Sequence, residues 1–178
     1  MQWATAKDAE RRQLRAYIGI GADAGGIGYE ADTGKYSFRF KMQNYGLTPA
    51  YKVTYAARID ILPYPPPYKS IVDQFPIDIA AAREQFEVTI NPASFTWGNV
   101  ESDSSVTLNQ LKEVLLARDR KIYSWGVIEY YDAFGFRNTT TFCESYTTTT
   151  QMTAKMKIGL SVTSGIVGQS CPHDDNAN

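Results

Sequence analysis

Residues 36–61 read YSFRFKMQNYGLTPAYKVTYAARIDI, and the pattern in this stretch decides the fold class. From residue 36 to 42, and again from 51 to 61, aromatic and apolar residues alternate with polar ones. A period of two residues is what a β-strand with one buried face requires. The glycine-containing turn at residues 44–46 therefore predicts two antiparallel strands, as in a β-meander or the start of a Greek key.

Further segments extend this pattern along the chain. Strands are predicted at residues 17–20, 86–90, 95–97, 121–131, 137–146 and 152–162. Residues 121–131 are apolar on both parities, which indicates a central strand with two buried faces. Asp132 and Gly135 take the first and fourth positions of a type I turn and predict a hairpin. The fold class is thus mainly β, an antiparallel β-sandwich of about seven strands.

Two helices complete the expected fold. Residues 1–15 are rich in alanine and charge and predict a weakly amphipathic N-terminal helix. Thr107 and Gln110 form a capping-box pattern that predicts one internal helix over residues 106–118. The expected organisation is a helical lead-in at 1–15, a β domain at 16–168 and a polar tail at 169–178.

Composition narrows the function classes. The chain has 178 residues, 43% of them hydrophobic, and a formal net charge of −1. Such a chain can bury the core of one domain, and its scattered lysines and arginines argue against a nucleic-acid partner. Because no run of about 18 apolar residues occurs, we expect membrane attachment only through a segment upstream of Met1.

Two motifs resemble a pattern found in small uncharacterised bacterial proteins that carry an N-terminal membrane helix. They are N-x-G-x-T-P-A at 44–50, and the run from Gly126 to Gly135 that leads to Phe142-Cys143. Residues 15–17 (Arg-Ala-Tyr) also match the family, although this chain has no membrane helix before them. The resemblance implies a membrane-tethered, extracytoplasmic, immunoglobulin-like domain. The family has no assigned catalytic residues.

Cys143 and Cys171 lie too far apart in the sequence for a metal-binding CxxC motif. In an oxidising compartment a disulfide between them would pin the tail to a core strand. The alternative is one buried thiol and one tail thiol.

A proline-rich segment follows the second strand of the opening stretch. It comprises Pro63, Tyr64, Pro65, Pro66, Pro67 and Tyr68. Four prolines favour an extended polyproline conformation, which an aromatic groove of a partner could bind. The alternative role is a rigid strap that ends a strand and protects a sheet edge.

Other motifs favour structural roles over sites. The glycine-rich stretch 19–28 lacks both the P-loop lysine and a following helix, so it predicts an inter-strand loop. The loop carboxylates Asp23, Glu30 and Asp32 match no ordered calcium motif and indicate a solvated acidic loop. Core packing is expected for the aromatics of the central strand, in preference to an exposed binding stripe; they are Tyr123, Trp125, Tyr130 and Tyr131.

Catalytic chemistry finds little support in the sequence. His173 is the single histidine and lies in the polar tail, where neither a catalytic triad nor a zinc site is expected. Glu129 and Asp132 flank the predicted hairpin turn, in which Asp132 already has a structural role. Asn138 begins a glycosylation sequon that we attribute to chance. We therefore predict no catalytic residue, no metal and no cofactor.

The leading hypothesis is a non-enzymatic binding or scaffolding module of the cell envelope with a protein partner, able to form homo-oligomers. An extracytoplasmic location is favoured over the cytoplasm. A structural protein of a phage or similar particle is the second hypothesis, in which residues 1–15 and the segment after residue 162 would make subunit contacts. A hydrolase with a dispersed site is the third.

Overall fold

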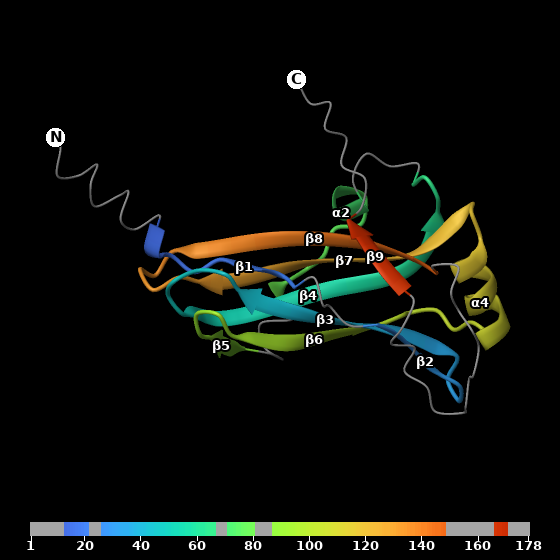
Figure 1. Ribbon diagram of the computed structural model, residues 1–178, viewed down its shortest axis with the longest axis horizontal. Coiled ribbons are helices and arrows are strands. Elements are labelled where there is room, and N and C mark those ends of the chain that lie inside the picture. Colours follow the sequence, from blue (N-terminus) through green and yellow to red (C-terminus); the bar gives the residue numbers. More distant parts are fainter. Residues whose placement is uncertain (1–12, 22–25, 67–70, 81–86, 149–165, 171–178) are drawn as a thin grey trace, which may run out of the picture.

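Two antiparallel β-sheets pack face to face in the computed structural model (Figure 1). The structure describes residues 13–21, 26–66, 71–80, 87–148 and 166–170. In chain order the elements are β1 (Ile18–Ile20), β2 (Ile27–Glu30), β3 (Lys35–Asn44), β4 (Ala50–Pro63), α2 (Ile71–Gln74), β5 (Val88–Ile90), β6 (Phe95–Glu101), α4 (Leu108–Leu116), β7 (Arg120–Tyr131), β8 (Arg137–Thr148) and β9 (Ile166–Ser170). The prediction of a mainly β, antiparallel fold is confirmed.

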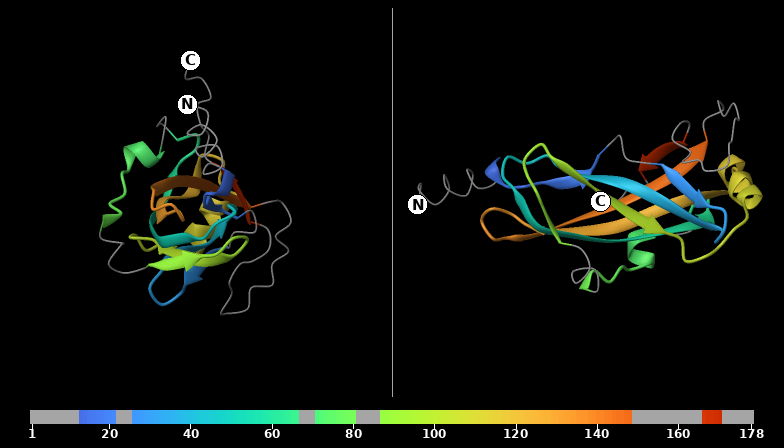
Figure 2. Two further views of the ribbon diagram at one scale, coloured as in Figure 1. Left: turned by 90° about the vertical axis from the view of Figure 1, so that its left-hand side faces the viewer. Right: turned by 90° about the horizontal axis from the view of Figure 1, so that it is seen from below.

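The two sheets divide the strands unequally. In the four-stranded sheet β3 is central, with β6 along one side and the short strands β1 and β2 along the other. The five-stranded sheet has the order β5-β4-β7-β8-β9. Figure 2 shows the two layers from the end and from below. The described residues form nine strands, compared with the expected number of about seven.

The core lies between the sheets and follows the predicted alternation of β3. Phe38 and Phe40 are buried side chains of β3 that point at the five-stranded sheet. Their ring centroids lie 4.8 Å from that of Tyr146 and 5.1 Å from that of Phe142, respectively. Offset aromatic contacts of this kind stabilise a core beyond the area they bury.

The alternation predicted for residues 51–61 is interrupted at its start. The register of β4 shifts between Ala50 and Val53, which are both buried, and Lys52 adopts a positive φ of 50°. A β-bulge inserts an extra residue into one strand and reverses the faces that follow it. Tyr51 is consequently exposed.

β7 is the central strand that the sequence predicted, and its outer face is covered as well. Tyr123 and Trp125 of that face pack in a second cluster with Ile71 of α2. The indole Nε1 of Trp125 donates a hydrogen bond to the carbonyl of Phe75 at 3.2 Å. The segment after the prolines therefore crosses the outer face of the five-stranded sheet (Figure 1).

The internal helix is confirmed as α4, which is shorter than predicted. Thr107 caps it, and both reciprocal bonds of the capping box with Gln110 are present. α4 ends at Leu116 and closes one end of the two-sheet body (Figure 1).

Four expectations differ from the structure or lie outside the described residues. The glycine-rich stretch contains strand β2, which begins at Ile27, so the prediction of a loop throughout 19–28 is wrong there. Strand β9 includes Gln169 and Ser170, which were assigned to the polar tail. The N-terminal helix, apart from its last residues, and the strand at 152–162 fall outside the described residues. No helix within the described ranges is long and apolar enough to cross a membrane.

Candidate functional site

The two carboxylates at the β7–β8 hairpin have structural partners. Asp132 Oδ1 accepts hydrogen bonds from the backbone N–H groups of Phe134 at 3.0 Å and Phe136 at 2.9 Å. Gly135 adopts a φ of +81° and its N–H donates to the Asp132 carbonyl, which completes the predicted turn. Glu129 is buried and forms a salt bridge with Arg137. Both carboxylates thus hold the hairpin together.

The proline-rich segment begins inside a strand. Pro63 is the last residue of β4 and pairs with Arg120, and Tyr64 N–H donates to the carbonyl of Asp119 at 2.8 Å. The ammonium group of Lys121 lies 3.5 Å from the centroid of the Tyr64 ring. The first half of the segment thus ends a strand, as a strap would. Pro67 and Tyr68 lie outside the described residues.

The remaining predicted sites are only partly described. Cys143 lies on β8 and is disulfide-bonded, whereas Cys171 lies outside the described residues, so the pairing of the two stays a prediction. Asp23 and His173 also lie outside them. Glu30 accepts a hydrogen bond from Thr33 Oγ1 at 2.6 Å. No cluster of three or more potential metal ligands occurs within the described ranges.

The aromatic residues of β7 belong to the core. Tyr123, Trp125 and Tyr130 are all buried, so the prediction of core packing is confirmed for these three. Burial raises the pKa of Tyr123 to about 12. Burial also raises the pKa of Tyr146. A hydrogen bond between its hydroxyl and Ser124 Oγ, at 3.1 Å, offsets part of this rise. These phenols favour their neutral form.

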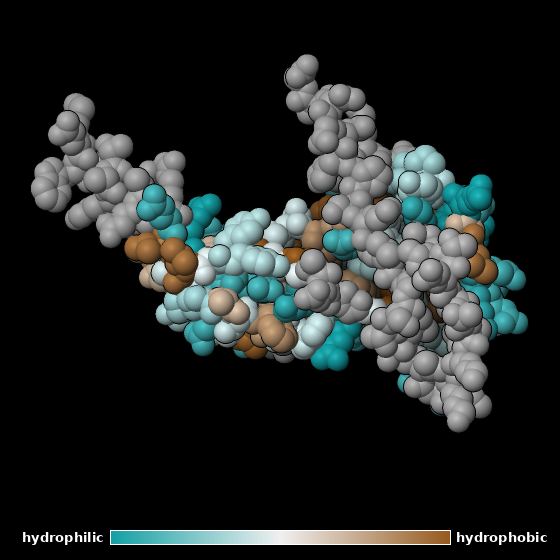
Figure 3. Space-filling view, in the orientation of Figure 1, coloured by the Kyte–Doolittle hydropathy of each residue, from teal (hydrophilic) through white to brown (hydrophobic). Residues whose placement is uncertain are grey.

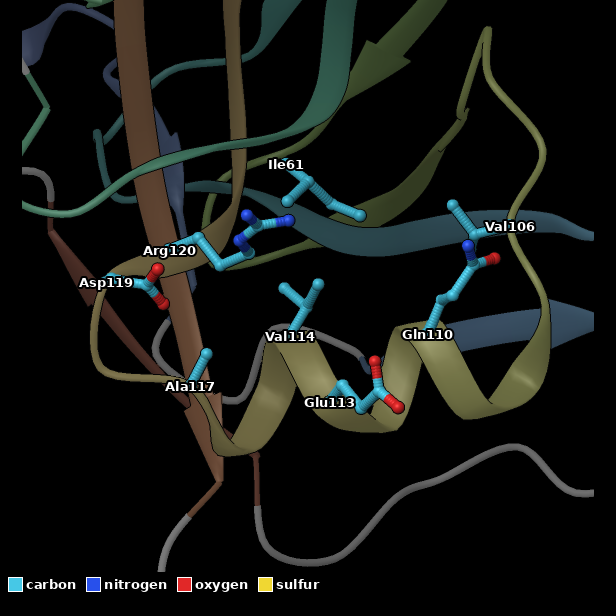
Figure 4. Close-up of a pocket in the computed structure, with 8 residues that line it drawn as sticks. All are labelled: Ile61, Val106, Gln110, Glu113, Val114, Ala117, Asp119 and Arg120. Carbon is cyan, nitrogen blue, oxygen red and sulfur yellow. The ribbon is translucent and has the colours of Figure 1, made fainter.

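A hollow of about 450 Å³ lies where α4 meets the ends of β4 and β7 (Figure 4). Its lining residues are Ile61, Val106, Gln110, Glu113, Val114, Ala117, Asp119 and Arg120. The aliphatic side chains Ile61 and Val114 face each other across it, while charged groups of both signs stand at its margin (Figure 4). This mixed lining sets no clear preference for one class of ligand.

A more distinctive surface lies on the outer face of the four-stranded sheet. It consists of Arg39 and Lys41 of β3 with Phe95 and Trp97 of β6, and we call it the β6 face. The register pairs Lys41 with Trp97, so alternation directs all four side chains away from the core. Phe95 and Trp97 remain 51% and 36% exposed.

Each of the two cations of the β6 face makes a cation–π contact with one of its two aromatic rings. The Arg39 guanidinium carbon lies 4.5 Å from the centroid of the Trp97 ring, and Lys41 Nζ lies 4.6 Å from that of Phe95. The two rings themselves meet edge to face at 5.8 Å. Each exposed cation–π contact is worth about 0.5–1 kcal/mol and limits the motion of a long side chain. No carboxylate of the described residues pairs with either cation.

β6 is also an edge strand. Its even-numbered residues hydrogen-bond to β3, as the Ser102 N–H to Tyr36 carbonyl bond at 2.8 Å shows. Its odd-numbered residues therefore direct their N–H and C=O groups away from β3. At Asn99 both groups are bound by the hydroxyl of Tyr55, at 3.0 and 3.1 Å. No group of the described residues binds the outward-facing N–H and C=O groups of Phe95 and Trp97.

The β6 face was not predicted, although both of its strands were. A strand was expected at 95–97, and the alternation of residues 36–42 predicted a polar outer side for β3. Aligning Phe95 and Trp97 beside Arg39 and Lys41 requires the pairing of two strands that are far apart in the sequence. No protein-family model matches this sequence, and no curated protein is detectably similar to it.

Proposed function

We propose that this protein is a non-enzymatic binding module of the cell envelope. In this proposal it is the extracytoplasmic part of a membrane-anchored protein and has an immunoglobulin-like topology. The two packed antiparallel sheets support that topology, and the motifs at 44–50 and 126–143 support the location through their resemblance. The partner is a protein that binds along β6.

The observation that carries the proposal is the edge of β6, where no described residue binds the backbone of Phe95 or Trp97, beside the exposed cation–aromatic pairs. An extended peptide can add to a free strand edge, where main-chain hydrogen bonds give affinity and side-chain contacts give specificity. Trp97 offers an open backbone edge and an exposed ring at the same position. Tryptophan and arginine are also the residues that most often dominate binding energy at interfaces.

The charge of the β6 face indicates the chemistry of the partner strand. Arg39 and Lys41 lie on this face with no carboxylate partner among the described residues. An extended segment with acidic side chains on one face would bring its carboxylates beside these cations. Complementary charges of this kind raise association rates and select the partner.

Position-specific crosslinking in cells tests this proposal. A photoreactive phenylalanine analogue replaces Phe95, which is half exposed, and in a control variant it replaces Leu116 at the far end of α4. We expect a discrete adduct from position 95 only, mapped by mass spectrometry to an acidic extended segment of another protein. The double variant Arg39→Glu/Lys41→Glu should lose this adduct, whereas Lys112→Glu should keep it.

The same experiment can overturn the proposal. Adducts of the same proteins from both positions would indicate contact without a specific surface. An adduct at position 95 that survives reversal of both charges would exclude an acidic partner strand. Cell fractionation of the same samples reports the location, and recovery from the cytosol alone would contradict the envelope assignment.

A further inference from the structure

A second exposed surface lies at the end of the molecule where the described chain begins. Three segments meet there: residues 13–17, the β3–β4 turn at 45–49 and the β7–β8 turn at 132–136 (Figures 1 and 2). We call this region the loop end. Its exposed apolar and aromatic side chains are Leu14, Tyr17, Tyr45, Leu47, Phe134 and Phe136. They account for most of the large hydrophobic residues that the described part of the chain exposes.

Backbone hydrogen bonds fix the β7–β8 turn that carries two of these side chains. In the β7–β8 turn, Asp132 binds the backbone of both Phe134 and Phe136, so the two residues extend from a fixed turn. Phe136 is 58% exposed and Leu47 is 67% exposed. Figure 3 shows hydrophobic residues gathered at this end of the surface. A surface that is ordered before binding loses little conformational entropy when it binds.

The other two segments form one unit. A Cβ at Gly46 would lie 2.3 Å from the carbonyl oxygen of Arg15, so the β3–β4 turn packs directly on the start of the described chain. The rings of Tyr17 and Tyr45 lie 6.5 Å apart on the outside of this contact. Tyrosine combines an apolar ring with a polar hydroxyl, and it is enriched where a protein meets the headgroup layer of a membrane.

Charge at the loop end favours an anionic surface. Arg15 and Lys52 are exposed there. The one carboxylate in the three segments belongs to Asp132, which is buried and turned toward backbone N–H groups. The opposite end instead carries charges of both signs, with Glu30, Asp32, Asp103 and Asp119 beside Lys35, Lys112, Arg118 and Arg120.

We propose that the loop end docks on the surface of a lipid bilayer with anionic headgroups. Leu47, Phe134 and Phe136 enter the interfacial layer, and Arg15 and Lys52 contact lipid phosphates. Exposed apolar side chains on two turns, with tyrosines and cations beside them, suit a fluid lipid surface, which needs no fixed complementary shape. The residues of the β6 face are not part of the loop end, so the inference does not rest on the proposed function.

Vesicle co-sedimentation of the full chain tests the inference. The probes are vesicles of equal parts phosphatidylglycerol and phosphatidylcholine, compared with vesicles of phosphatidylcholine alone. We expect binding to the anionic vesicles that weakens with salt. Phe134→Ser/Phe136→Ser should lower the partition coefficient about tenfold or more, since two phenyl groups leave the interface. Arg15→Glu/Lys52→Glu should lower it by a similar factor.

Leu116→Ser serves as the matched control, because Leu116 is 72% exposed at the opposite end, on α4. It should leave the partition coefficient unchanged, and thermal unfolding checks that every variant is folded. Failure of the wild-type chain to bind either vesicle would overturn the inference, as would an equal loss in Leu116→Ser. The wild type could instead fail to bind vesicles and form oligomers that the phenylalanine substitutions dissociate. That result would show that the loop end is a protein interface and that lipid docking is wrong.

Discussion

Replacing Asn44 should destabilise the fold more than its size suggests. Its side chain is fully buried and makes four hydrogen bonds to the backbone. Oδ1 accepts from Tyr17 N at 3.3 Å and from Gly46 N at 2.9 Å. Nδ2 donates to the carbonyls of Thr48 at 2.8 Å and Ile90 at 3.0 Å. One amide therefore joins the entry to β1, the β3–β4 turn and β5.

The magnitude follows from the groups that Asn44→Leu would leave without partners. Leucine is similar in size, so little cavity forms, but two N–H and two C=O groups lose their bonds. Each buried, unsatisfied group costs about 1–3 kcal/mol, although those near the surface can recover water. We expect a loss of about 3–5 kcal/mol in the free energy of unfolding. This is a large part of the roughly 5–15 kcal/mol that stabilises a typical domain.

Asn44→Asp distinguishes the two hydrogen bonds that Asn44 accepts from the two that it donates. The carboxylate keeps the two accepted bonds but places negative oxygen against two carbonyls, so we expect its pKa to rise in the folded state. The unfolded chain then ionises first as pH increases. The variant should therefore approach wild-type stability at acidic pH and lose stability as pH rises through about 4 to 7.

Urea unfolding followed by tryptophan fluorescence measures both variants. With an m-value of about 2 kcal/mol/M, Asn44→Leu should lower the midpoint by about 2 M. Asn99→Leu, at an exposed position of β6, is the matched control and should change the stability by about 0.5 kcal/mol or less. A loss below about 1 kcal/mol in Asn44→Leu would refute the assignment of Asn44 as the link between these segments.

Three further predictions concern the core and the C-terminal strand. In Gly126→Ala the new Cβ would lie 2.5 Å from the Phe142 ring and 2.7 Å from the Ala56 carbonyl oxygen, so we expect thermal melting to show a loss of about 1–3 kcal/mol. Gly19→Ala should cause little loss, because its Cβ would face only the exposed rings of Tyr45 at 3.3 Å and Tyr17 at 3.9 Å. The pairing of Glu144 with Ser170, continued by one residue, predicts that Cys143 bonds to Cys171; intact mass should rise by two hydrogens on reduction, and an unchanged mass would contradict this. Burial raises the pKa of Tyr36 and of Tyr123 to about 12, so the folded chain keeps protons that the unfolded chain releases above pH 10. The free energy of unfolding should therefore fall between pH 10 and 12 by about 1.4 kcal/mol per pH unit for each tyrosine. A free energy from chemical unfolding that stays constant over this pH range would contradict the prediction.

The features that were predictable from the sequence depend on neighbours in the chain. The alternation in β3, the Asp132–Gly135 turn and the Thr107–Gln110 cap each use residues within one strand or turn. Such patterns reflect the geometry of a single element and are readable without knowledge of the partner strand. They gave the fold class and most of the strands.

The features that were missed depend on contacts between distant segments. The β6 face requires residues near 40 to pair with residues near 97. The outer cover of Trp125 comes from Phe75, and the bonds of Asn44 reach Ile90. Strand β2 was missed because its glycine favours a loop by propensity, whereas pairing with β3 places Gly28 against Ser37. The structure at such positions depends on which distant strands pair, and a single sequence does not reveal that pairing.

The open edge of β6 can be tested directly by residue-resolved amide hydrogen exchange, measured by NMR on the free chain. We expect the exchange rates to alternate along β6. The Thr96 and Gly98 N–H groups bond to β3 and should exchange slowly, whereas the Trp97 N–H faces the open edge and should exchange quickly. Asn99 should be intermediate, because the Tyr55 hydroxyl accepts its N–H. Addition of the crosslinked partner segment as a peptide should slow Trp97 selectively. A Trp97 amide as protected as that of Thr96 in the free chain would contradict the claim that β6 offers an edge for binding.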